Sequence, residues 1–131
     1  MWERLTKRAR AVTLSIPCEA CEKVAAVLEL LPAGWHTALS PDSDAFVIRG
    51  FVGVSSESVG ALSAELRQAL ERGNVPQLHA LNPQWAPFYC EACARSYCIA
   101  HWNAAPRFDD EGFTDGFYGS CPAGHDRMLD D

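Results

Sequence analysis

Closely spaced cysteine and histidine pairs in the last third of the chain constrain its fold more than any other feature. Three pairs lie between residues 90 and 125: Cys90 and Cys93, Cys98 and His101, and Cys121 and His125. A spacing of two or three residues lets both side chains of a pair reach one ion, and tetrahedral zinc takes two such pairs. We therefore predict a zinc site built from these six side chains.

The number of ligands suggests a fourth pair. Six ligands exceed one tetrahedral site and fall short of two, and Cys18 with Cys21 would complete the second site and use all six cysteines. In chain order, the first and third pairs could share one ion and the second and fourth the other. The alternative joins the first pair with the second and the third with the fourth. One zinc ion with two spare residues is also open, so we expect one or two ions.

Composition and charge indicate which partners and which cellular location to expect. The 131 residues carry a net charge of −6, which argues against a nucleic-acid backbone as partner. No stretch approaches the roughly 20 apolar residues of a membrane span. The N-terminus has no export signal, so we expect a reducing cytoplasmic location, where cysteines bind metals rather than form disulfides.

Hydrophobic periodicity predicts an α/β layer over residues 11–81. Ala11–Pro17 alternates as a strand does, whereas Val24, Val27, Leu28 and Leu31 recur at helical spacing. Further strands are expected at Trp35–Leu39 and Ala45–Val52, then a helix starting near Ser55–Ser58 and ending at Gly73–Asn74, and a short strand at Leu78–Leu81. This β-α-β-β-α-β order is that of a ferredoxin-like sandwich.

A composition change marks a predicted boundary at the proline-containing segment Asn82–Pro87. The segment after it is rich in Cys, His and aromatic residues and poor in aliphatics, a size and composition at which metals replace a core. We expect an α+β protein with a sandwich domain at 1–84 and a treble-clef or knuckle-type zinc module at 85–131. A helical turn at Asp126–Leu129 would complete a treble clef.

The loop containing Cys18 and Cys21 has two other interpretations. Amide groups at a helix start could lower the thiol pKa values, as in a redox pair. The stretch Ile16–Cys21, with Val24 and Leu28 behind it, also resembles the heavy-metal-associated domain, although Pro17 replaces the usual methionine. That resemblance implies a soft-metal carrier that binds copper at Cys18 and Cys21.

The run from Phe88 to Trp102 resembles the ligand blocks of RING-related and in-between-RING zinc fingers. The resemblance implies two zinc ions, docking of other proteins through Ile99 and Trp102, and a ubiquitin-ligase-like helper that docks a conjugating enzyme. A RING has eight ligands within the finger, whereas this segment has six. The segment from Cys121 to the end is also similar to small uncharacterised bacterial Cys/His proteins.

A binding role is favoured over catalysis. Mixed Cys/His sets of four are typical of closed structural zinc sites, and no catalytic triad, phosphate-binding glycine loop or dinucleotide motif is present. We therefore expect a zinc-dependent adaptor module whose partner is another protein. The aromatic residues expected to form the contact patch or a small core are Trp102, Phe108, Phe113, Phe117 and Tyr118.

Overall fold

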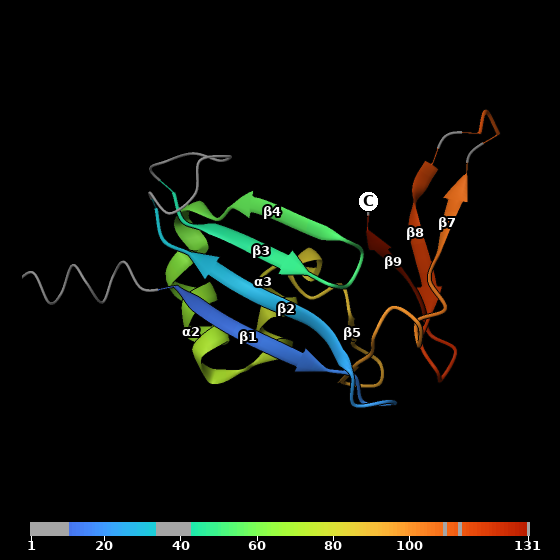
Figure 1. Ribbon diagram of the computed structural model, residues 1–131, viewed down its shortest axis with the longest axis horizontal. Coiled ribbons are helices and arrows are strands. Elements are labelled where there is room, and N and C mark those ends of the chain that lie inside the picture. Colours follow the sequence, from blue (N-terminus) through green and yellow to red (C-terminus); the bar gives the residue numbers. More distant parts are fainter. Residues whose placement is uncertain (1–10, 34–42, 109, 113, 131) are drawn as a thin grey trace, which may run out of the picture.

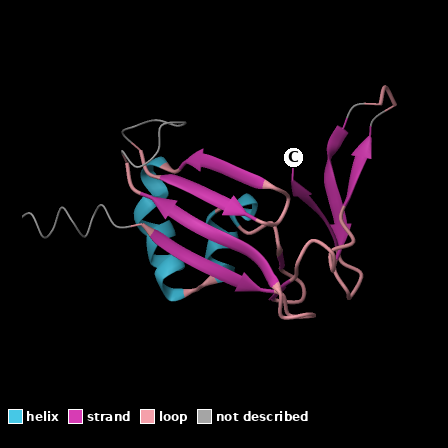
Figure 2. Cartoon of the chain, in the orientation of Figure 1, coloured by secondary structure: helices cyan, strands magenta, loops and turns pink. Residues whose placement is uncertain are grey.

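The computed structural model describes residues 11–33, 43–108, 110–112 and 114–130 (Figures 1 and 2). The described chain is a mixed α+β protein that consists mostly of sheet, with two α-helices and two groups of cysteine and histidine side chains. No helix within these ranges is long and apolar enough to cross a membrane.

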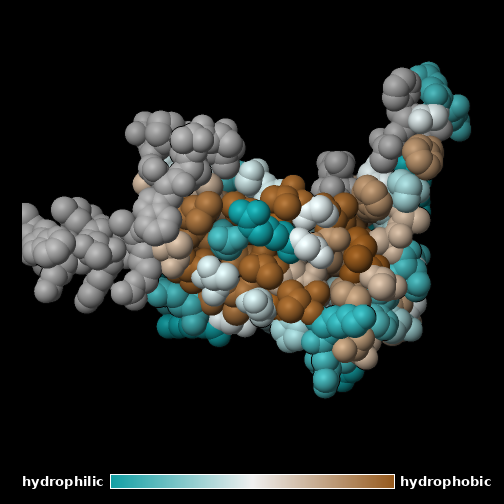
Figure 3. Space-filling model, viewed as in Figure 1, coloured by the Kyte–Doolittle hydropathy of each residue, from teal (hydrophilic) through white to brown (hydrophobic). Residues whose placement is uncertain are grey.

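A four-stranded antiparallel sheet forms the first layer. Its strands lie in the order of the sequence, namely β1 (Val12–Pro17), β2 (Val24–Leu31), β3 (Ala45–Arg49) and β4 (Val54–Ser58). Neighbouring strands pair as hairpins, with Leu28 opposite Leu14 on one side and opposite Ile48 on the other. The alternate side chains of β2 point to the outer face, where Glu29 bonds Arg49 at 2.6 Å. Figure 3 shows this outer face as apolar surface around a small polar area.

Helices α2 (Ser63–Arg72) and α3 (Val75–Leu81) cover the inner face of the sheet (Figure 1). A short 3₁₀ turn, η1 (Gly60–Leu62), leads from β4 into α2, which ends at Gly73 with φ of 64°. This end agrees with the predicted stop at Gly73–Asn74, because glycine tolerates the left-handed conformation. Asn74 caps α3 by accepting a hydrogen bond from the Gln77 amide at 3.1 Å.

The second half of the chain contains short antiparallel strands. The 3₁₀ turn η2 (Pro83–Trp85) precedes a small hairpin of β5 (Tyr89–Cys90) and β6 (Arg95–Ser96). A three-stranded sheet then follows in the order β7 (Ala105–Phe108), β8 (Thr114–Ser120) and β9 (Asp126–Asp130), and Figure 2 shows it apart from the first sheet.

One continuous cluster of buried side chains connects the two halves. It begins between the first sheet and the helices, at residues such as Leu30 and Leu66, and continues through Phe88 to Leu129 on β9. Trp102 lies in its second half, 1% exposed, and its indole N–H donates to the Phe88 carbonyl at 2.9 Å. The ligand pairs are thus attached to the same core that supports the sheet.

The predicted ferredoxin-like order is wrong in several elements. Residues 24–31 form strand β2 rather than a helix, residues 54–58 form strand β4, and residues 78–81 belong to helix α3. The predicted helical turn at Asp126–Leu129 is strand β9. The predicted strand at Trp35–Leu39 lies outside the described residues. The predicted strand at Ala11–Pro17 is confirmed as β1, and of the predicted strand Ala45–Val52 the part Ala45–Arg49 is confirmed as β3.

Candidate metal centres

All eight predicted ligand side chains gather into two Cys₃His groups. The sheet cluster consists of Cys18, Cys21, Cys98 and His101, and the hairpin cluster consists of Cys90, Cys93, Cys121 and His125. Within each group the four ligand atoms all lie within 4.8 Å of one another, so each group could hold a metal ion. The arrangement matches the first of the two partitions considered from the sequence.

Turns between strands hold the four ligand pairs. The first pair lies in the loop between β1 and β2, the second at the end of β5 and in the turn before β6, the third after β6, and the fourth between β8 and β9. The first and third pairs form the sheet cluster, and the second and fourth form the hairpin cluster. Because the pairs alternate along the chain, each cluster encloses one pair of the other, and only the sheet cluster takes ligands from both halves of the chain.

The distances between ligand atoms fit one tetrahedral ion in each cluster. Two sulfurs at about 2.3 Å from zinc are about 3.8 Å apart at the tetrahedral angle, and a sulfur and a nitrogen are about 3.5 Å apart. The Sγ atoms of Cys21 and Cys98 are 3.8 Å apart, and those of Cys93 and Cys121 are 3.7 Å apart. Distances from sulfur to histidine Nδ1 range from 3.2 to 3.6 Å. All six cysteines are free thiols, since a disulfide would need about 2.05 Å.

The backbone at the ligand turns is unusual. Three non-glycine residues in the described ranges have positive φ, and each follows a ligand pair closely: Glu22 (65°), Ala94 (55°) and Asn103 (49°). Gly124 supplies the same left-handed conformation within the fourth pair, with φ of 91°. A left-handed conformation costs a residue with a Cβ about 1–2 kcal/mol, so an opposing interaction must hold these turns. Convergence of the ligands on a bound ion would supply such an interaction.

Backbone amides favour the ionised form of some thiols. Burial raises the pKa of Cys121, but hydrogen bonds from the amides of His125 and Ala123 outweigh burial and lower this pKa to about 6. Burial likewise opposes ionisation of Cys18, whose pKa is nevertheless lowered by surrounding backbone amides. Burial raises the pKa of Cys90 to about 11. A metal cation would have to compensate for this burial, because thiolates are the species that bind.

Arg127 on β9 is a supporting residue beside the hairpin cluster, and the sequence alone carries no signal for it. Its Nη1 donates to the carbonyl oxygens of Ala86 at 3.1 Å and Tyr89 at 2.7 Å, and its Nη2 to that of Pro83 at 3.1 Å. Burial lowers the Arg127 pKa, and the charge of Cys90 acts in the opposite direction. The guanidinium therefore attaches β9 to the segment that precedes Cys90 and places a positive charge near that thiol.

We expect Arg127→Gln to lower the free energy of unfolding by about 1.5–3 kcal/mol, the range for hydrogen bonds to a charged group. Chemical denaturation followed by tryptophan fluorescence measures this loss. Arg107→Gln is the matched control, because Arg107 is exposed and lies over the Tyr118 ring at 3.9 Å, a contact worth about 0.5–1 kcal/mol. Equal losses in the two variants would contradict a special role for Arg127.

The predicted partner contacts differ in exposure. Trp102 is buried in the core and cannot serve as a surface contact, which corrects the prediction; it is buried because its indole N–H finds a carbonyl partner there. Ile99 is half-buried and packs against the core, and its contact role stays a prediction. Phe108 is 59% exposed, whereas Phe117 is half-buried. Phe113 lies outside the described residues.

Comparison with known proteins identifies a family without a described activity. A family model described as a domain of unknown function (DUF8328) matches residues 7–131. No curated protein and no solved structure matches the chain.

Proposed function

We propose that this chain, which belongs to the DUF8328 family, is a zinc-dependent protein-interaction module in which each Cys₃His cluster binds one structural zinc ion. The observation that carries the proposal is the spacing of the ligand atoms. Sulfur–sulfur separations of 3.8 and 3.7 Å are those of thiolates on a shared tetrahedral ion. They are too long for disulfides.

The donor set favours zinc in a structural role. Three thiolates and one imidazole complete a tetrahedral shell, and a catalytic zinc would need a position left open for water or substrate. Thiolate and imidazole donors together suit zinc better than calcium or magnesium, which take oxygen ligands. We infer that both ions stabilise the fold and that neither takes part in a reaction.

The alternating ligand pairs suggest what the ions stabilise. We propose that residues 1–84 and 85–131 are two parts of the molecule and that the sheet cluster connects them. Cys18 and Cys21 come from the loop after β1, whereas Cys98 and His101 come from the turn after β6. An ion there would hold the first sheet against the second half and fix the surface that a partner protein meets.

A copper carrier gains no support from this geometry. Such a carrier presents two thiolates at an accessible loop, whereas Cys18 is buried and lies 3.6 Å from His101 Nδ1. With Cys98 also in reach of Cys21, four donors surround one point. A shell of four donors retains an ion rather than transferring it.

Metal analysis of the purified protein tests the proposal. We expect two zinc ions per chain by inductively coupled plasma mass spectrometry, and X-ray absorption at the zinc edge to give three sulfur and one nitrogen neighbours per ion. Zinc content near one ion per chain would reject the paired sites. Oxygen neighbours in the absorption spectrum would instead indicate an open site, and with it a catalytic role.

A further inference from the structure

Strand β4 is an open edge of the first sheet. All five of its residues are exposed, and only one of its edges pairs, with β3. Two backbone hydrogen bonds show which residues of β4 face β3: the Gly50 amide donates to the Gly53 carbonyl, and the Val59 amide donates to the Asp44 carbonyl. Between these two bonds, every second residue of β4 directs its backbone N–H and C=O toward β3, and the residues between them direct theirs away. The backbone groups of Val54, Ser56 and Ser58 therefore point away from β3.

The described residues offer no partner to these outward backbone groups, so this edge of β4 is open to another strand. Edge strands commonly carry proline or lysine, which discourage pairing with another chain. The opposite edge, β1, ends in Pro17, whereas the sequence of β4, Val-Ser-Ser-Glu-Ser, contains neither residue. An open edge of this kind is a site where an extended peptide can add as a further strand, and the inward-pointing charge of Glu57 restricts which peptide can do so.

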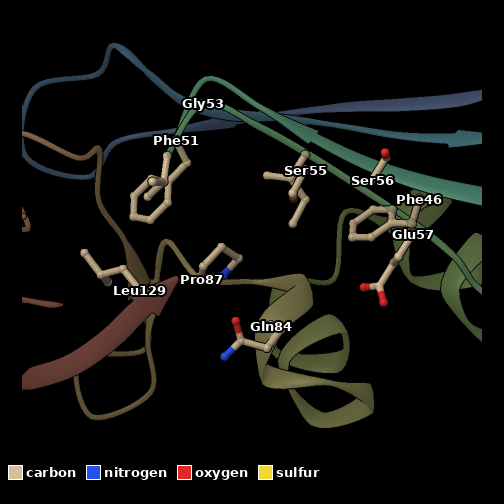
Figure 4. Close-up of a pocket in the computed structure, with 11 residues that line it drawn as sticks. Phe46, Phe51, Gly53, Ser55, Ser56, Glu57, Gln84, Pro87 and Leu129 are labelled. Carbon is tan, nitrogen blue, oxygen red and sulfur yellow. The ribbon is translucent and has the colours of Figure 1, made fainter. Parts of the chain in front are cut away.

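A cavity of about 240 Å³ lies along the inner side of this edge (Figure 4). At one end its lining is apolar and includes Phe51, Pro87 and Leu129. At the other end lies Glu57, whose Oε1 accepts a hydrogen bond from the Trp85 indole at 2.6 Å. No lysine or arginine lines the cavity, so its charge is negative.

We propose that β4 binds an extended segment of a partner protein, which adds as a fifth strand and carries an apolar residue and a basic residue two positions apart. The segment would bond the outward backbone groups of Val54, Ser56 and Ser58. This inference rests on the proposed interaction role and assigns it a surface and a partner chemistry. It does not depend on which metal the clusters hold.

The strand register sets the spacing of the two partner residues. Ser55 and Glu57 point to the inner face of the sheet, because they pair with Ile48 and Phe46 of the core. Peptide residues opposite Ser55 and Glu57 point to the same face, since side chains alternate along a strand. The residue opposite Ser55 enters the apolar end of the cavity, and the residue opposite Glu57 meets the carboxylate. Complementary charge therefore calls for lysine or arginine there.

The test uses a fluorescein-labelled peptide of alternating threonine and valine that carries leucine and lysine two positions apart, and a second probe with glutamate in place of lysine. Fluorescence anisotropy with the zinc-loaded full chain measures binding. We expect the lysine probe to bind at least about tenfold more tightly than the glutamate probe, with the difference largely lost in Glu57→Gln. The amide of that variant can still accept the Trp85 hydrogen bond.

Ser56→Pro isolates the backbone contribution. It removes an amide that points away from β3, so pairing with β3 is kept, and we expect it to weaken the lysine probe at least tenfold. Ser56→Thr keeps the amide and should bind as the natural chain does. If Ser56→Pro lowers the melting temperature, its binding result is set aside. The inference is then tested only by comparing the lysine and glutamate probes on the natural chain and on Glu57→Gln.

Two outcomes would overturn the inference. If neither probe binds while the chain retains two zinc ions, the β4 site is wrong although the metal proposal stands. If sedimentation shows a dimer of the natural chain that Ser56→Pro dissociates, the occupant of the edge is a second copy of this chain. Metal content is measured on the same samples, so failure of the zinc proposal is recognised separately.

Discussion

Cys121→Ser is expected to reduce bound zinc from two ions per chain to one and to unfold β8 and β9, while the sheet cluster, whose Cys98 and His101 lie between β6 and β7, keeps its ion. Cys121 is buried at 3% exposure, and its sulfur lies 3.7 Å from that of Cys93 and 3.2 Å from His125 Nδ1. A serine hydroxyl is a much poorer zinc ligand than a thiolate, so the hairpin cluster would lose its ion.

The size of the effect follows from what zinc contributes in small modules. Structural zinc supplies on the order of 10–16 kcal/mol of apparent binding free energy, which is coupled to folding. A whole domain is stable by only about 5–15 kcal/mol, so we expect that β8 and β9, the strands on either side of Cys121 and His125, would not stay folded without this ion. Limited proteolysis should then cut within β8 and β9 while the helices and first sheet are cut more slowly.

Histidine variants provide a matched comparison. His125→Gln removes a ligand of the hairpin cluster and should also lose one zinc ion. His79→Gln changes the histidine that lies outside both clusters in the described part of the chain, where it packs against Tyr89 with ring centroids 5.4 Å apart. That variant should keep two ions. A Cys121→Ser chain that resists protease and binds two zinc ions would refute the structural role of this cluster.

The ligand residues were predictable because their signal is local. A spacing of two or three residues within a pair is visible in the sequence, and the structure brings the four pairs together. The choice between the two partitions was not predictable, since it depends on how β1, β6 and β8 are placed in space. Cys18 and His101 are 83 positions apart, and no local pattern encodes such a contact.

The fold of the first half was only partly predictable, and β2 shows why. Its apolar residues at positions 24, 27, 28 and 31 match a helical stripe, yet the segment is a strand flanked by β1 and β3. Ala26, Leu28 and Leu30 face the core, while Val27 and Leu31 are half-buried on the outer face. A strand that is apolar on both faces lacks the alternation that would identify it.

Helix α3 was mispredicted for a different reason. Its sequence Val-Pro-Gln-Leu-His-Ala-Leu is short, and the prediction took Leu78–Leu81 for a strand. The informative signal was upstream: Asn74 as a cap, followed by Pro76 in the first turn, is a typical helix start. Arg127 had no comparable signal, because its three carbonyl partners at residues 83, 86 and 89 lie far away in the chain.

Changing both Cys18 and Cys21 to serine is expected to remove one zinc ion and leave the hairpin cluster loaded. The two sulfurs lie near His101 Nδ1 and Cys98 Sγ, at 3.6 and 3.8 Å respectively. Without them the sheet cluster retains two ligands, which is too few to hold zinc at low concentration. Mass spectrometry under native conditions should show a chain with one ion.

The stability of this variant should fall by an amount set mainly by chain entropy. An ion shared by Cys21 and Cys98 closes a loop across 77 positions, and a cross-link over such a loop contributes about 4–5 kcal/mol. Hydrogen exchange should then accelerate most in β1 and in the adjoining end of β2, next to the loop that loses its ion. The helices, which pack against the sheet independently of the ion, should change less.

Cys21→His is the control for this prediction. Cys21 is half-buried, and histidine in its place still offers a donor, so the sheet cluster becomes a Cys₂His₂ site of a type that also binds zinc tightly. We expect two ions and nearly natural exchange rates in this variant. If the double serine variant loses both ions, binding at one cluster depends on the other. If it keeps both ions, Cys18 and Cys21 are not ligands. Another interaction must then hold the β1–β2 loop beside the turn after β6.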